Sequence, residues 1–174
     1  MFPYTINPTN STKAYTLIEL MVVVLLIGLM LALAIPRFHD ALLTDDLKAA
    51  TRRMIGTVRC LRNKAVREQK VYRLHFDLES NRFWIEWHPM TNEERAEARE
   101  KASGFPGGIR ILNVCRTGAG KKEVGDTAIH FNKKGYVEQA VIHLGAEDGR
   151  AHTIVLSPFL GTIKTYDRYV EIDQ

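Results

Sequence analysis

The sequence predicts an α+β fold in which one long N-terminal helix packs on antiparallel β-sheet. The first observation is an uncharged apolar run from Leu20 to Ile35. Counted from Tyr15, at about 1.5 Å per helical residue, the segment is long enough to cross a hydrocarbon core of about 30 Å. The second is an amphipathic period of three and four residues that follows as far as Ala65. Beyond Lys70 the hydrophobic period changes to two, which predicts strands.

Glu19 is the one charged residue of the apolar segment. An ionised carboxylate is costly in lipid, so an acid within a spanning segment indicates a function with a charged partner. A cut between Ala14 and Tyr15 would create a new amino group four residues before Glu19. Residues at i and i+4 share a helix face, so this ammonium and the carboxylate can pair within one subunit or between neighbours.

The stretch from Ala14 to Leu20 reads Ala-Tyr-Thr-Leu-Ile-Glu-Leu. It resembles the prepilin processing motif of type IV pilins and type II secretion pseudopilins. The resemblance implies that a prepilin peptidase cuts before Tyr15 and methylates the new amine, and that Glu19 is the fifth residue of the mature chain. The sequence departs from the family pattern at two positions, with Ala14 in place of the usual Gly and Tyr15 in place of the usual Phe.

Gly28 and Pro36 coincide with the positions at which these families carry a helix-loosening Gly and Pro. Pro36 lacks an N–H and its ring crowds the carbonyl of Ala32, which predicts a bend there. Gly28 lowers the helix propensity of the same region. One interpretation is that the segment loosens when subunits pack into a filament, and the other is an incidental kink.

We therefore expect three segments: residues 1–14 as a cleaved leader, residues 15–36 as a transmembrane and assembly helix, and residues 37–174 as a periplasmic pilin-like domain that includes the second half of the helix. The orientation follows from the resemblance, which places the leader in the cytoplasm. A secretory signal peptide fits less well, because its apolar region normally has about 7–15 residues and ends in a small-residue cleavage site. A plain signal anchor has no use for Glu19.

The helix that enters the domain carries an apolar stripe and a basic face. The stripe consists of Leu43, Leu47, Ala50, Met54, Ile55, Val58, Leu61 and Ala65. Between these residues lie Lys48, Arg52, Arg53, Arg59, Arg62, Lys64 and Arg67. The basic face fits a solvated surface or contact with acidic neighbours in an assembly better than binding to DNA or acidic lipid. The net charge of +4 is too small to require a nucleic-acid ligand.

The remainder predicts strands with one charged helix. A hairpin is expected from residues 71–77 and 82–87, followed by a surface helix between Thr91 and Ala102, with Thr91 and Glu94 as its cap. Further strands are expected at 109–114, 127–131, 136–144, 153–156 and 162–172, with 116–126 as a polar loop and 127–144 as one hairpin. The order of these last segments also resembles the C-terminal domain of GspH/FimT-type minor pilins.

We find no pattern of an enzyme, metal site or cofactor site. The stretch Gly118-Ala-Gly-Lys-Lys122 falls short of a phosphate-binding loop, because Lys122 replaces the required Ser or Thr and Cys115 stands where the first Gly belongs. The His residues show no ligand spacing with Cys or carboxylates. Cys60 and Cys115 can form a disulfide outside the inner membrane or remain free thiols, and both interpretations stay open.

The resemblance predicts a structural minor pseudopilin of a type II secretion system, held in the bacterial inner membrane until it joins a periplasmic pseudopilus. Its partners would be other pseudopilins or pilins, the prepilin peptidase and the membrane. The alternative is a minor type IV pilin of the FimT/FimU kind that acts in pilus assembly or DNA uptake, with DNA as a further partner. A single-pass anchored enzyme is disfavoured by the lack of paired catalytic groups.

Overall fold

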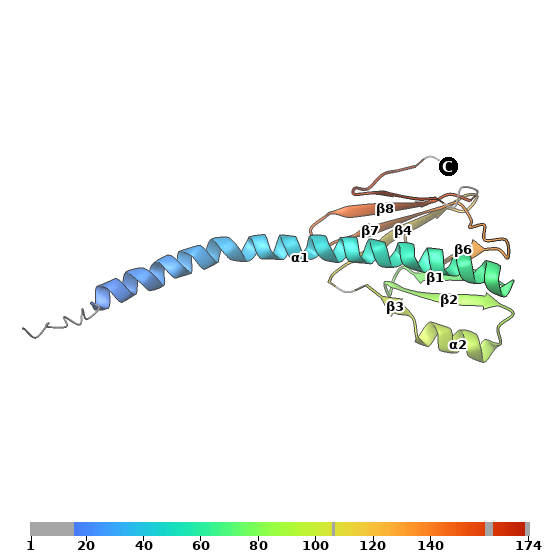
Figure 1. Ribbon diagram of the computed structural model, residues 1–174, viewed down its shortest axis with the longest axis horizontal. Helices are drawn as coiled ribbons and strands as arrows, with labels where there is room; N and C mark the ends of the chain where they lie inside the picture. Colours follow the sequence, from blue (N-terminus) through green and yellow to red (C-terminus); the bar gives the residue numbers. More distant parts are fainter. Residues whose placement is uncertain (1–15, 106, 159–161, 173–174) are drawn as a thin grey trace, which may run out of the picture. The chain divides into compact units, whose positions relative to one another are not determined.

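The computed structural model describes residues 16–105, 107–158 and 162–172, without the side chains of residues 32–45 (Figure 1). The chain divides into two compact units, Met1–His39 and Asp40–Gln174. Helix α1 (Leu17–Glu68) contributes to both units. The predicted α+β class, a helix followed by antiparallel sheets, is confirmed.

Within the second unit, α1 buries the stripe that its sequence predicts. Leu47, Ala50, Met54, Val58, Leu61 and Ala65 are each at most 3% exposed. The helix ends at Glu68, and Gln69 follows in the left-handed region with φ 53°. Such a residue redirects the chain and closes the last turn, so β1 can start immediately afterwards at Val71.

A four-stranded antiparallel sheet has the order β3-β2-β1-β6. Its strands are β1 (Val71–Asp77), β2 (Arg82–His88), β3 (Ser103–Gly104) and β6 (Asp126–Phe131). The predicted β1–β2 hairpin is confirmed, with Phe76 opposite Phe83. Helix α2 (Asn92–Glu100) lies between β2 and β3, and its predicted cap is present as a capping box between Thr91 and Glu94.

A five-stranded antiparallel sheet has the order β5-β4-β7-β8-β9. Its strands are β4 (Arg110–Arg116), β5 (Gly120–Lys122), β7 (Ala140–Gly145), β8 (Ala151–Leu156) and β9 (Ile163–Tyr166). Side chains from both sheets and from α1 form one hydrophobic core, which includes Phe76, Phe131, Ile142, Ile154 and Leu61.

The prediction of one hairpin over residues 127–144 is wrong. β6 pairs with β1 and β7 pairs with β4 and β8, so the two strands belong to different sheets, and a single bridge from Phe131 to Val137 is what remains of the expected pairing. Every residue of β7 is buried. A strand that buries both faces needs a central place in a sheet, which a terminal hairpin with β6 would not provide.

Two boundaries also differ from the predictions. The loop expected at residues 116–126 contains β5, which pairs with the end of β4 through a turn with Gly118 and Gly120 at positive φ. The last predicted strand stops at Tyr166 instead of Ile172. Residues 167–172 leave the sheet edge and lie across the outer face of the sheet, where the side chains of His143 and Thr153 contact their backbone.

Candidate functional site

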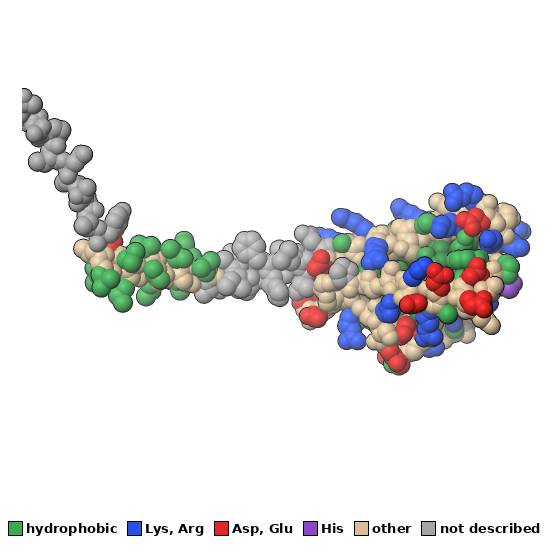
Figure 2. All heavy atoms as spheres, turned by 90° about the horizontal axis from the view of Figure 1, so that it is seen from below, with side chains coloured by type: hydrophobic (Ala, Val, Ile, Leu, Met, Phe, Trp, Pro, Cys, Tyr) green, Lys and Arg blue, Asp and Glu red, His purple; other side chains and the backbone are tan. Residues whose placement is uncertain are grey.

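The start of α1 exposes its apolar side chains all round. From Leu17 to Leu31 the large apolar residues are between 46% (Val23) and 80% (Leu17) exposed. Figure 2 shows these side chains gathered on this segment, whereas acidic and basic side chains intermix over the domain. Within the part of the chain that the structure describes, no helix is long and apolar enough to cross a membrane.

Glu19 lies in the first turn of α1 with its side chain exposed. Thr16 caps this turn, since its hydroxyl oxygen and its carbonyl both accept from the Glu19 N–H, at 3.3 and 3.1 Å. A carboxylate at this position interacts favourably with the helix N-terminus. Among the described residues, the Glu19 carboxylate has no ion-pair partner. It is therefore available to an ammonium group from outside this part of the chain.

The other predicted processing residues, Ala14 and Tyr15, lie outside the described residues. The backbone of α1 is helical through Gly28 and Pro36. Gly28 is exposed, and a Cβ added to it would meet nothing within 4 Å. The side chain of Pro36 lies outside the described part. Helix loosening at these two positions stays a prediction.

Cys60 and Cys115 are free thiols in the structure. Cys60 is exposed on α1, and Cys115 is half-buried on the outer face of the five-stranded sheet, opposite the core residue Val114. Burial raises the pKa of the Cys115 thiol above its usual value. The sequence left a disulfide and free thiols open as alternatives, and the structure shows free thiols.

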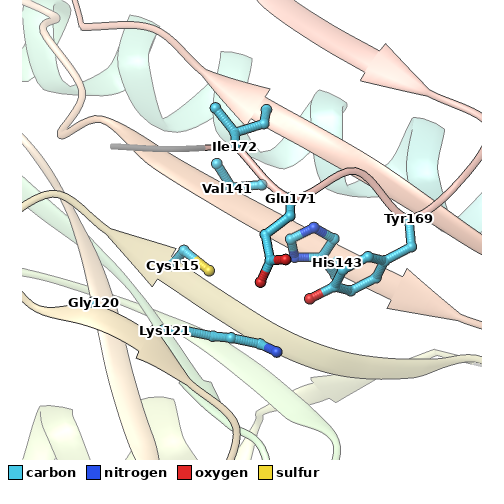
Figure 3. Close-up of a pocket in the computed structure, with 8 residues that line it drawn as sticks. All are labelled: Cys115, Gly120, Lys121, Val141, His143, Tyr169, Glu171 and Ile172. Carbon is cyan, nitrogen blue, oxygen red and sulfur yellow. The ribbon is translucent and has the colours of Figure 1, made fainter.

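A cleft of about 240 Å³ opens on this outer face (Figure 3). It is lined by Cys115, Gly120, Lys121, Val141, His143, Tyr169, Glu171 and Ile172. In Figure 3 the polar ends of Lys121, Glu171 and Tyr169 all lie to one side of the Cys115 sulfur. Lys121 pairs with Glu123 at 2.6 Å and lies 5.7 Å from the centre of the Tyr169 ring. Lys121 is therefore engaged with Glu123 and Tyr169.

The C-terminal segment forms one wall of this cleft and is held by buried polar side chains of the sheet. Thr153 donates to the Arg168 carbonyl at 2.8 Å and accepts from the Val170 N–H at 3.0 Å. His143 lies 3.0 Å from the Val170 carbonyl through Nε2 and stacks on Tyr169 with ring centres 4.1 Å apart. The hydrogen bonds are made to the backbone of the segment, which explains why no sequence motif predicts them.

His143 has the environment of a structural histidine. Its Nδ1 lies 2.6 Å from the Asn113 side-chain oxygen and its Nε2 faces the Val170 carbonyl, so the single N–H of a neutral imidazole has an acceptor in either tautomer. Burial lowers the pKa of His143, an effect that the nearby Lys121 reinforces and Glu171 opposes. A raised thiol pKa and an imidazole committed to two partners do not form a nucleophile and base. His143 and Thr153 therefore serve to hold the C-terminal segment on the sheet.

A second cleft, of about 410 Å³, lies beside His152 and is lined by residues of α1, β8 and the C-terminal segment. His152 Nδ1 is 3.0 Å from the Thr51 hydroxyl, and Nε2 is 3.6 Å from Asp167. The order hydroxyl, imidazole, carboxylate is that of a hydrolase triad. The hydroxyl, however, is buried and donates to the Leu47 carbonyl at 2.8 Å, so it is a helix contact. Among the described residues, no cluster of three or more His, Cys, Asp or Glu side chains could hold a metal ion.

The outer face of the four-stranded sheet carries a third group that the sequence did not reveal. His75 stacks on Trp84 with ring centres 5.1 Å apart, and Arg99 of α2 lies 5.3 Å from the centre of a Trp84 ring. Glu86 accepts from Trp84 Nε1 at 3.0 Å and lies 3.3 Å from His75. Each member of this group contacts another member, which is typical of a structural cluster.

Comparison with known proteins gives a motif and a fold. Residues 9–35 match the family model for the prokaryotic N-terminal methylation motif. The crystal structure of the minor pseudopilin EPSH from the type II secretion system of Vibrio cholerae matches with a TM-score of 0.53 at 11% identity, covering 74% of this chain and 98% of that chain. The chain has a pilin-like fold.

A further structure of the minor pseudopilin EpsH from the same organism gives a TM-score of 0.49 at 12% identity, covering 70% of this chain and 97% of that chain. No curated protein sequence matches this chain significantly. At 11% identity the EPSH crystal structure supports the fold alone, and the methylation motif separately supports the interpretation of the N-terminal segment. Motif and fold together support a GspH-like pseudopilin or pilin-like protein, as the sequence predicts.

Proposed function

We propose that this chain is a structural minor pseudopilin of a type II secretion system. The observation that carries the proposal is Glu19, an acid at the start of an apolar segment and inside the matched methylation motif. The described apolar side chains of this segment are exposed, so they need lipid or neighbouring subunits to cover them. The domain, by contrast, has a complete core of its own. A membrane-held subunit that later enters a filament satisfies both requirements.

In the proposed pathway a prepilin peptidase cuts between Ala14 and Tyr15 and the Tyr15 amine is methylated. The subunit waits in the inner membrane with residues 37–174 in the periplasm. On assembly, Glu19 pairs with the Tyr15 amine of an adjacent subunit, which removes the cost of a buried carboxylate and sets the axial stagger. Gly28 and Pro36 let the helix adjust as the subunits pack.

The test is the variant Glu19→Ala in the full chain, co-expressed with a prepilin peptidase and the other filament subunits. We expect cleavage to be largely intact, because the cut lies four residues away, and incorporation into the pseudopilus to be lost. Intact mass and N-terminal sequencing measure processing, and the amount of subunit in sheared filaments measures assembly. The matched control is Ile18→Ala, an adjacent exposed position without a charge. Normal assembly of Glu19→Ala would refute the pairing.

The alternative, a minor type IV pilin, shares the processing motif and the fold. It differs in the filament that incorporates the subunit, so co-assembly with type IV pilus subunits instead of pseudopilins would decide for it.

A further inference from the structure

The positive charge of the domain is concentrated on one stretch of α1. Residues 47–67 contain seven Lys and Arg and no Asp or Glu, whereas residues 68–172 contain fifteen of each sign. All the excess charge in residues 47–172 therefore lies on this helix, whose opposite face is buried in the core.

Two of the seven cations have a task inside the domain. Arg53 donates to the Gly104 carbonyl at 2.9 Å and lies 5.5 Å from the centre of the Phe83 ring. Arg62 donates to the Gly135 carbonyl at 2.9 Å. These contacts attach the helix to the β3 region and to the turn after β6. They explain the presence of these two arginines, and no partner protein is needed to account for them.

The remaining cations lack such a task. Arg67 reaches the neighbouring Glu68 at 3.9 Å, and both side chains are at least one third exposed. Within the described part of the chain, Lys48, Arg52, Arg59 and Lys64 have neither an ion pair nor a side-chain hydrogen bond. Unpaired like charges on one helix repel each other and destabilise it slightly. Their retention points to a use outside the domain.

Lys48, Arg52 and Arg59 form what we call the cationic row. All three are exposed, and their spacings of four and seven residues place them on one side of the helix. Val66 continues the row seven residues after Arg59 and is 45% exposed. Three long cations next to an apolar side chain make a narrow surface suited to one complementary acidic face.

We propose that the cationic row docks an acidic protein surface of a neighbouring subunit in the filament, which rests on the proposed function. Nucleic acid fits less well, because the electrostatic affinity for DNA depends on the number of phosphates that Lys and Arg neutralise and the row offers three cations from a single helix. A lipid surface fits less well, because an interfacial helix presents a broad apolar face and the apolar face of this helix is already buried in the core.

The experiment reverses the charge of the row in the full chain with Arg52→Glu and Arg59→Glu together. The control is Lys133→Glu with Lys134→Glu, which makes the same change in net charge on the exposed turn after β6. We expect normal processing of both variants, a loss of incorporation by about tenfold or more for the row variant, corresponding to about 1.4 kcal/mol, and incorporation at the wild-type level for the control. Should the reversal unfold the domain, Arg52→Gln with Arg59→Gln replaces it.

Position 66 gives an independent readout, because Val66 continues the row and is 45% exposed. In a Cys60→Ser, Cys115→Ser background, Val66→Cys carries the sole thiol, and we expect its maleimide labelling to be slower in the filament than in the detergent-extracted subunit.

Wild-type incorporation of the row variant, or equal labelling of the Val66→Cys thiol in both states, would overturn the proposal. Retention of a DNA duplex by residues 40–174 at about 150 mM salt, lost in the row variant, would also overturn it. Absence of the wild-type chain from the filament refutes the proposed function itself, so the two failures are distinguishable.

Discussion

The two parts of α1 use apolar side chains in opposite ways. Between Leu17 and Leu31 the apolar residues cover every side of the helix and stay exposed. Between Leu47 and Ala65 they form one stripe that is buried against two sheets. The first pattern leaves an apolar surface that the described residues do not cover, and the second is complete within the domain. One helix therefore combines an exposed apolar segment with a wall of the domain core.

The largest expected effect on the free energy of unfolding comes from making the same Leu→Ala substitution in each of these two parts of α1. Leu61 is fully buried and Leu25 is 69% exposed. We expect Leu61→Ala to lower the free energy of unfolding of the domain by about 2–5 kcal/mol, since it leaves a cavity in the core, and Leu25→Ala to leave it unchanged. Urea unfolding of the detergent-solubilised chain measures both, because Trp84 and Trp87 are the two tryptophans and lie in β2.

A loss of domain stability in Leu25→Ala comparable to that in Leu61→Ala would contradict the division of α1 into an exposed apolar segment and a buried stripe. Both variants remove the same atoms from the same residue type, so the comparison isolates burial from side-chain chemistry.

The sequence reveals those features that depend on neighbours along the chain. The amphipathic stripe of α1, the β1–β2 hairpin and the cap at Thr91 were predictable, because each follows from residues a few positions apart. The contact of Thr51 with His152 joins residues 101 positions apart. The separation of β6 from β7 depends on which sheet edge each strand meets, and alternation alone does not encode this choice. The docking of the C-terminal segment uses its backbone, which leaves no pattern in the sequence.

The next effect concerns the link between the two sheets. Asn81, in the turn between β1 and β2, donates to the Ile109 carbonyl at 2.7 Å and accepts from the Ile111 N–H at 2.9 Å. Its φ of 53° favours Asn or Gly. We expect Asn81→Gly to keep this backbone conformation and lose both bonds, lowering the free energy of unfolding by about 2 kcal/mol. Urea unfolding measures the change.

The control is a comparison of Asn63→Gly with Asn63→Ala. Asn63 is exposed on α1, so these two variants differ in helix propensity alone. Equal stability of Asn81→Gly and wild type would mean that the sheets are joined by the core alone.

The smallest effect is a dependence of domain stability on pH. Burial lowers the pKa of His75, His143 and His152 in the folded chain, whereas unfolded His has a pKa of about 6.5. Between the two values the unfolded chain binds more protons, so the free energy of unfolding rises with pH. The histidine contribution is present above about pH 6.5 and is lost as the pH falls through the folded pKa values.

Urea midpoints between about pH 5 and pH 7.5 measure this dependence, and His143→Asn should flatten it, because it removes the histidine beneath the C-terminal segment. Hydrogen bonds lower the pKa of four carboxyl groups, those of Glu68, Asp77, Glu97 and Asp148, so these groups titrate at more acidic pH than this window. A loss of stability confined to the pH range in which these carboxyl groups titrate would contradict the histidine contribution. It would show that the three imidazoles stay accessible to protons in the folded chain. The C-terminal segment would then cover the outer face of its sheet less tightly than α1 covers the core.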